Sequence, residues 1–190
     1  MSLALANLVR SVLSRPETAK INFSVGGMMI EPSSFRMVKE KILGGQIDVV
    51  YDRSLAAKVA KYRPLENTLH LSTTFRIDGI STDQEALIIH ECVHAAADLS
   101  ALAVKIGLDE AAAYVAQCLY FYYRNEAALK RQGVRPTFTD PILEEAWKVG
   151  TLARSKNKLS DRDIGQLLWV ISQHRLYKKN HTFTRPYDGV

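Results

Sequence analysis

The stretch HECVH, from His90 to His94, decides how this chain folds, because it places the pattern H-E-x-x-H within a segment of helical character. Residues four apart share one face of a helix, so His90 and His94 can present two imidazoles to a single metal ion. Glu91 stands beside them, where its carboxylate can take a proton from a metal-bound water. The pattern is typical of a zinc hydrolase, usually a peptidase.

The residues around this motif predict a helix that is mostly buried. Ser81 or Thr82 can cap its start, and the acidic Asp83 and Glu85 complement the positive end of the helix dipole. A buried polar side chain needs a partner, and a metal ion is one way to provide it. The alternative is a pair of core histidines with an exposed glutamate between them. The apolar positions that favour burial are Leu87, Ile88, Ile89, Cys92, Val93, Ala96 and Ala97.

A catalytic zinc site needs a third protein ligand and an open position for water. Where an extended metallopeptidase motif would continue with glycine and a third histidine, this chain has Ala97 and Ser100, which excludes that class. The best candidate is Glu110, which follows His94 in a separate, alanine-rich helical segment. Two antiparallel helices joined by a short link would bring Glu110 back beside the histidines.

Two aspartates remain as alternative ligands. Asp109 precedes Glu110 and can also cap the helix that we expect to begin after Gly107. Asp98 lies one turn beyond His94, where it could bind the metal or orient an imidazole. Glu110 itself could be a first-turn glutamate that only complements a helix dipole.

The two segments together resemble a known group of enzymes. H-E-x-x-H at 90–94, followed by EAAAYVA at 110–116, is similar to the zincin metallopeptidases whose third ligand is a glutamate on a helix. Within that group it most resembles the ImmA/IrrE type, in which a helix reading E-A-x-x-F-A or close to it follows, with Tyr114 here at the aromatic position. The resemblance covers roughly residues 45 to 125.

This resemblance implies a small α+β peptidase domain. Zn²⁺ is expected on His90, His94 and Glu110, with Glu91 as the general base. It also implies that the strand expected at 67–72, just before the motif helix, borders the cleft and offers its free edge to an extended peptide. His70 in that strand would then be a possible cleft residue, although a lone histidine in a strand is more often structural.

An anionic tetrahedral intermediate needs a further hydrogen-bond donor. Tyr114 is the first candidate, because it lies one turn after Glu110 on the same helical face. An aromatic residue in an alanine-rich helix is also a common core residue, so a packing role is the alternative. His174, His181 and Tyr120 are other donors that folding could bring near.

The whole chain, 1–190, predicts one α+β domain: a short antiparallel or mixed sheet packed on the motif helix, followed by a helical C-terminal half. Composition agrees, since 190 residues with 47% hydrophobic content can bury one core. We expect strands at 21–25, 28–30, 47–51 and 67–72, an N-terminal helix within 1–20 ending near Pro16, further helices at 32–43, 109–131, 140–155 and 160–177, and an irregular tail at 180–190 laid across the body.

Composition also bears on location and partners. Cys92 and Cys118 are expected to be small buried residues in a reducing compartment, and a disulfide between them has little support. We find no basic leader and no apolar run long enough for a membrane, so a cytoplasmic protein is expected, with non-classical export left open. The net charge of +5 favours a solvated basic face over a nucleic-acid surface.

Three functions fit these observations. The leading one is a zinc-dependent peptidase acting on a protein or peptide. The second is a zinc amidase acting on cell-wall peptide, as a toxin domain would. The third is a non-catalytic binding module that keeps the zincin fold, which a closed site with four protein ligands would favour. The sequence leaves the oligomeric state open.

Overall fold

The structure of the chain is a computed structural model, which describes residues 3–185, 187 and 189. The first two residues of the segment predicted to hold the N-terminal helix (1–2) and three residues of the predicted tail (186, 188 and 190) lie outside the described residues. The fold is α+β, as predicted, with six α-helices and two small three-stranded sheets in the described part. Among these helices, none combines the length and the apolar character that crossing a membrane requires.

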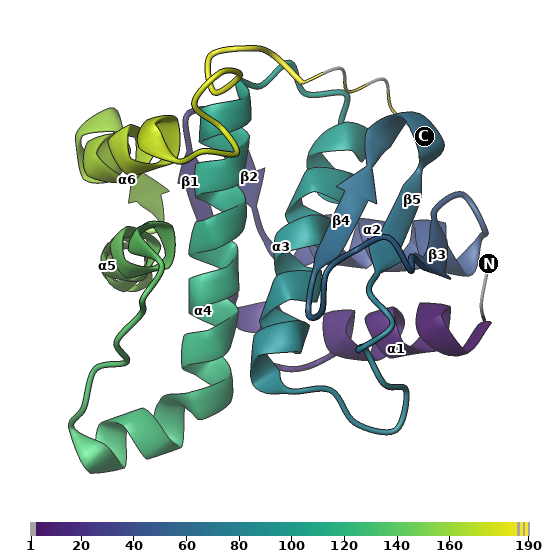
Figure 1. Cartoon of the computed structure of the whole chain (residues 1–190). Helices are drawn as coiled ribbons and strands as arrows, with labels where there is room; N and C mark the ends of the chain where they lie inside the picture. The colour runs from purple at the N-terminus through teal and green to yellow at the C-terminus, as the bar shows by residue number, and fades with distance from the viewer. Residues whose placement is uncertain (1–2, 186, 188, 190) are drawn as a thin grey trace.

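Two long antiparallel helices form the centre of the molecule (Figure 1). They are α3 (Thr82–Leu99), which carries the H-E-x-x-H motif, and α4 (Ile106–Gln132). One sheet packs against α3, while the C-terminal helices pack against α4. The remaining helices are α1 (Leu3–Leu13), α2 (Pro32–Leu43), α5 (Pro141–Ser155) and α6 (Asp161–Gln173).

The sheet beside α3 has the strand order β3–β5–β4, with β3 at Asp48–Tyr51, β4 at Ala60–Arg63 and β5 at Thr68–Leu71. β5 runs parallel to β3 and antiparallel to β4. All four residues of β5 are buried, because the strand is central. Its two edges are paired with β3 and β4, so the prediction that this strand offers a free edge to the cleft is wrong. The edge next to α3 belongs to β4, a strand that the sequence analysis did not identify.

A second sheet, with the order β2–β1–β6, corrects the expectation of a single sheet. The strands β1 (Phe23–Val25) and β2 (Met28–Ile30) form the expected hairpin. Its two-residue turn, Gly26-Gly27, has φ of 54° and 87°, a conformation that glycine adopts without strain. β6 (Lys158–Leu159) pairs in parallel with β1 and is too short to show an alternating pattern.

Capping residues set most of the predicted helix starts. The Ser81 side chain accepts a hydrogen bond from the Gln84 N–H at the start of α3, and Ser81 N–H donates to the Gln84 side chain in return. Asp140 caps α5 ahead of Pro141, and Ser160 caps α6. The C-terminal ends of two helices differ from the prediction. α1 stops at Leu13, short of the predicted limit, and α6 stops at Gln173 rather than near 177.

The start of α4 differs from the prediction. The helix begins at Ile106, so Asp109 lies inside the first turn and does not cap it. Instead, the Ile106 N–H donates to the Phe183 carbonyl and the Gly107 N–H donates to the His181 carbonyl, each at 2.8 Å. The C-terminal segment thus satisfies N–H groups that have no partner within the helix. A Cβ at Gly107 would lie 3.1 Å from the His181 carbonyl oxygen, so glycine permits this close approach.

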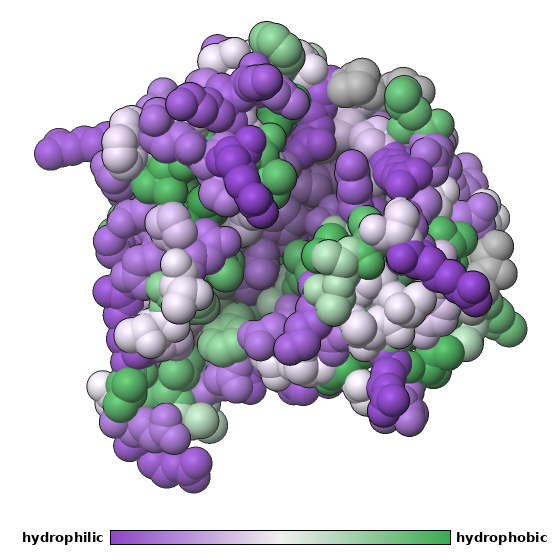
Figure 2. Space-filling view, viewed as in Figure 1, coloured by the Kyte–Doolittle hydropathy of each residue, from purple (hydrophilic) through white to green (hydrophobic). Residues whose placement is uncertain are grey.

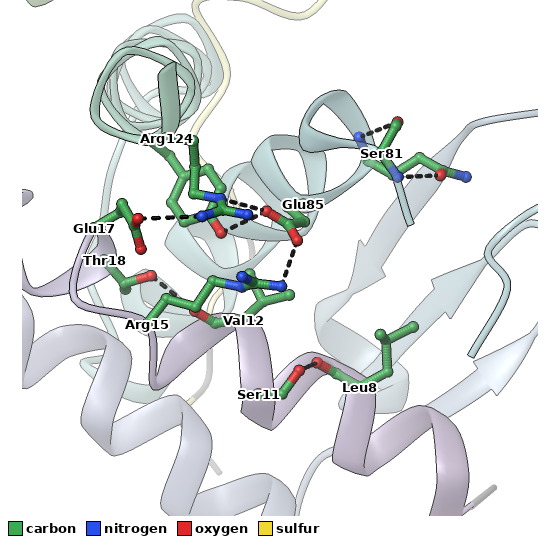
Figure 3. Close-up of polar contacts among 11 residues, drawn as sticks. Leu8, Ser11, Val12, Arg15, Glu17, Thr18, Ser81, Glu85 and Arg124 are labelled. Atoms are coloured by element: carbon green, nitrogen blue, oxygen red, sulfur yellow. Dashed lines mark hydrogen bonds and ion pairs between the residues drawn. The ribbon is translucent and has the colours of Figure 1, made fainter. Parts of the chain in front are cut away.

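A buried carboxylate ties the N-terminal segment to the central helix pair (Figure 3). Glu85 on α3 is 3% exposed and receives hydrogen bonds from three side chains: Arg15 at 2.6 Å, Tyr120 at 2.9 Å and Arg124 at 3.0 Å. Arg124 also contacts Glu17 at 3.2 Å. Glu85 therefore does more than complement a helix dipole, because it joins the segment after α1 to both α3 and α4.

We predict that Glu85→Gln lowers the free energy of unfolding by about 2 kcal/mol, because it removes the charge from two ion pairs. This value is at the low side for a buried ion pair, since both arginines keep part of their surface in water. Asp83→Asn is the matched control, as Asp83 is exposed in the same helical turn and should change stability by less than about 0.5 kcal/mol. Chemical denaturation measures both variants. Equal effects would contradict the anchoring role of Glu85.

Candidate metal centre

Two adjacent helices bring three potential metal ligands together. His90 and His94 lie on α3 and Glu110 lies on the first part of α4, and all three are buried. Their ligand atoms lie within 4.8 Å of one another. Glu110 Oε2 is 3.4 Å from His90 Nε2, and Glu110 Oε1 is 3.7 Å from His94 Nε2. A tetrahedral zinc site with bonds of 2.0–2.1 Å has ligand separations of about 3.3 Å, so the residues fit such an ion.

The neighbours of each imidazole determine which nitrogen can bind a metal. The Gln117 side-chain oxygen accepts a hydrogen bond from His90 Nδ1 at 3.0 Å. Asp109 Oδ2 lies 2.8 Å from His94 Nδ1 in an ion-pair contact that is not aligned as a hydrogen bond, and its negative charge favours a proton on that nitrogen. Both partners therefore favour a proton on Nδ1, which leaves the Nε2 lone pairs facing Glu110. This is the arrangement in which protein histidines bind metals through Nε2.

The two oxygens of Glu110 have different surroundings. Oε1 is in contact with the Arg185 guanidinium. Oε2 is buried and has no hydrogen-bond partner among the described residues, although it faces His90. A buried acceptor without a donor is costly, and a cation between Glu110 and the imidazoles would remove that cost.

Asp109 supports the site without joining the ligand group. Besides approaching His94, its Oδ2 accepts a hydrogen bond from the Tyr187 hydroxyl at 2.8 Å and contacts Arg185 Nε. Of the two alternative ligands from the sequence, Asp109 is thus the residue that orients an imidazole. Asp98 is fully buried and accepts a hydrogen bond from the Tyr62 hydroxyl at 2.7 Å, and it is not a member of the ligand group.

Burial and charge act in opposite directions on the ionisable groups of this cluster. Burial alone would lower the pKa of His94, but the negative charges of Asp109 and Glu110 outweigh it and raise that pKa. Burial would raise the pKa of Glu110, yet His94, His90 and Arg185 hold it well below its usual value. Glu110 is therefore ionised, as a metal ligand must be.

Glu91 is fixed by the edge of the neighbouring sheet. The backbone N–H of Tyr62 in β4 donates a hydrogen bond of 2.8 Å to Glu91 Oε2, and Glu91 is 7% exposed. Because β4 is an edge strand and this N–H bonds to α3, the group belongs to the outer edge of β4. One oxygen of the expected base is thus held in place by backbone rather than by a side chain.

Tyr114 lies against the first histidine of the motif. Its ring centroid is 4.5 Å from that of His90, in an edge-to-face arrangement, and its hydroxyl is 3.2 Å from the hydroxyl of Tyr177. Burial, followed by the charge of nearby Glu110, raises the pKa of Tyr177. Burial likewise raises the pKa of Tyr114, so both hydroxyls remain protonated near the ligand group.

The other candidate donors have different surroundings. Tyr120 bonds to Glu85 in the separate anchor described above. His174 follows α6, and its Nδ1 accepts a hydrogen bond from the Leu176 N–H. His181 touches Gly107 through its backbone. His70 lies between Asp52 and Glu66, 3.2 Å and 3.1 Å away, so its ring nitrogens are engaged within that ion-pair group rather than in a cleft.

The surface is hollowed near the middle of the face shown in Figure 2, where hydrophilic side chains line the depression over the region in which α3 and α4 run side by side. A cavity of about 300 Å³ also adjoins the two helices, and Gln117, the partner of His90, forms part of its wall. Its other lining residues are Asp83, Ala86, Cys118, Phe121, Thr137, Phe138, Thr139, Asp140 and Leu143.

The two cysteines, Cys92 and Cys118, are buried and free, and burial raises the pKa of both thiols.

Several residues of the site were not identified from the sequence. Gln117 lies two turns after Glu110 on α4, so helical spacing could have indicated it. Tyr177, Arg185 and Tyr187 reach the site from the C-terminal segment, far from the motif. That segment carries no pattern that predicts a contact with α4.

Comparison of this chain with protein-family models, with curated proteins and with solved structures finds no match.

Proposed function

We propose that this protein is a zinc-dependent metallopeptidase of the zincin type, most similar to the ImmA/IrrE type. One observation carries the proposal: two imidazoles with protons favoured on Nδ1 direct their Nε2 lone pairs at an ionised, partly unpartnered carboxylate. Three acceptors facing one another inside a protein repel unless positive charge lies between or beside them, and Arg185 is beside only one Glu110 oxygen. The H-E-x-x-H spacing independently indicates the two histidine ligands.

His90, His94 and Glu110 would hold the zinc ion, which when bound polarises a carbonyl and lowers the pKa of a water molecule. Glu91 takes the proton from the attacking water and delivers it to the leaving nitrogen. Its bond from the Tyr62 N–H restricts the carboxylate to one orientation. The hydroxyl pair of Tyr114 and Tyr177 is the donor that stabilises the developing negative charge.

An extended peptide is the substrate that best suits the surroundings. The outer edge of β4 lies on the side of α3, and a sheet edge can pair with a peptide strand. The Tyr62 N–H on this edge is bonded to Glu91, so a peptide would pair with other backbone groups of β4. The hollow in Figure 2 gives access to the same region. A cell-wall peptide is the second candidate, because it presents the same amide chemistry.

A metal-free cluster is the main competing interpretation. The raised pKa of His94 would suit a protonated imidazole between Asp109 and Glu110, and the residues would then be a buried ion-pair group serving a binding module. Metal content separates the two interpretations directly.

We predict one zinc ion per chain in protein purified without chelators, measured by elemental mass spectrometry. His94→Ala and Glu110→Ala should each lose most of it, because two ligands cannot hold zinc tightly. Glu66→Ala is the control, since Glu66 is an exposed carboxylate that also contacts a histidine, His70. Zinc retained in Glu110→Ala would rule out Glu110 as the third ligand, and no metal in the parent protein would favour the ion-pair group.

We predict that Glu91→Gln abolishes peptide hydrolysis, by about 10²-fold or more, while zinc content stays at the parent level. The amide keeps the volume and can still accept from the Tyr62 N–H, but it cannot take a proton from water. Hydrolysis of a fluorescent peptide library and of cell-wall preparations measures the effect and distinguishes the two substrate classes. Normal turnover in Glu91→Gln would refute the general-base assignment.

We also predict that Tyr114→Phe and Tyr177→Phe lower kcat with little change in KM, because a transition-state donor contributes only when charge develops. The larger decrease, about 10²-fold, identifies the hydroxyl that acts as donor. Tyr120→Phe is the control, since that hydroxyl bonds to Glu85 in the other network. Unchanged kcat in both single variants would exclude the tyrosine pair from catalysis.

A further inference from the structure

One guanidinium from the C-terminal segment contacts two neighbouring carboxylates of the metal centre. Arg185 Nη2 contacts Glu110 Oε1, and Arg185 Nε contacts Asp109 Oδ2. The two carboxylates have different tasks, since Glu110 is a proposed ligand and Asp109 orients His94. A single planar group thus connects to two of the three proposed ligands, one directly and one through Asp109.

Backbone pairing places this arginine. The Arg185 N–H donates to the Val104 carbonyl at 2.9 Å, and Thr184 forms a β-bridge with Lys105. Together with the two hydrogen bonds that cap the start of α4, these contacts place the segment 181–185 alongside residues 104–107, just before Glu110. The segment passes over the top of α4 in Figure 1. The position of Arg185 therefore follows from a defined backbone register rather than from a free side chain.

The contacts leave Glu110 in a defined orientation. Because Arg185 occupies Oε1, the carboxylate cannot rotate without losing a charge-assisted hydrogen bond, and Oε2 stays directed at His90. The same guanidinium and the Tyr187 hydroxyl hold Asp109 at 2.8 Å from His94 Nδ1. Two ligands are thereby presented to one point by groups that do not themselves bind metal.

We propose that Arg185 is a positioning residue of the metal centre and that docking of the segment 181–185 completes the site. This inference rests on the proposed zinc site. The role depends on the shape of the guanidinium as well as on its charge: one nitrogen bonds to Glu110 while another contacts Asp109, whereas an ammonium group is a point charge with a single nitrogen.

Electrostatics and positioning predict opposite signs for the loss of Arg185. A positive charge near a dication repels it, so charge alone predicts that Arg185→Gln binds zinc more tightly. Loss of positioning predicts weaker binding, because Glu110 and Asp109 lose the orientation that serves the metal. An arginine that competes with zinc for Glu110, as an inhibitory plug would, also predicts tighter binding. The sign of the change therefore decides the question.

The experiment measures the zinc dissociation constant by competition with a chromophoric chelator. We expect Arg185→Gln to weaken binding about 10- to 100-fold, the range found when a group that supports a metal ligand is lost. Arg185→Lys should recover only part of the zinc affinity that Arg185→Gln loses. Arg175→Gln is the matched control, an exposed arginine of the C-terminal segment that should bind zinc as the parent does. Unchanged or tighter binding in Arg185→Gln, or full recovery by Arg185→Lys, would overturn the proposal.

Cobalt(II) in place of zinc gives a second readout. A change in geometry at Glu110 alters the visible absorption spectrum of Co²⁺, which a general loss of stability in a folded variant does not. If Arg185→Gln fails to fold, Tyr187→Phe removes only the hydroxyl that bonds Asp109 and should weaken zinc binding by a smaller factor. If Tyr187→Phe then shows the zinc affinity and the Co²⁺ spectrum of the parent protein, the proposal is overturned. A parent protein that binds no zinc refutes the proposed function itself, whereas a parent that binds zinc with unaffected variants refutes only the role of Arg185.

Discussion

The approach of Glu110 to two imidazole nitrogens is the constraint on which the rest of the structure depends. Three buried groups that all accept hydrogen bonds lie within a few ångströms of one another, an arrangement that is stable only with positive charge between or beside them. Arg185 supplies one such charge from the outer side. The inner side, between the Nε2 atoms and Oε2, matches the dimensions of a zinc ion.

The surrounding fold holds these groups in place from several directions. α3 and α4 lie side by side along most of α3, so their relative position is fixed by apolar packing above and below the site. The sheet edge holds Glu91, and the C-terminal segment holds Glu110 and Asp109. Near the start of α3, the Glu85 anchor joins the segment after α1 to the same helix pair. Most of these contacts are hydrogen bonds and ion pairs, which depend on geometry and therefore fix orientation as well as position.

The sequence predicted what depends on local patterns. The H-E-x-x-H spacing placed two histidines on one helical face, and the link to an alanine-rich helix placed Glu110 near them. Ser81 marked a helix start by its own chemistry. Contacts that depend on the path of the whole chain were missed. β4 alternates apolar and charged residues, but its four residues are too few for the pattern to stand out from the surrounding segment. The caps of α4 are carbonyls, whose position no side-chain pattern reveals.

The distance in sequence between Glu110 and Arg185 bears on the order in which the site can assemble. Glu110, the last of the three proposed ligands in the chain, is synthesised 75 residues before Arg185. On the ribosome, the ligands can therefore meet, and capture a metal ion, while their supporting guanidinium has yet to be translated. Metal capture would at that stage be reversible, and docking of the later segment would retain the ion. Loading and retention would then be separate events, governed by different parts of one chain.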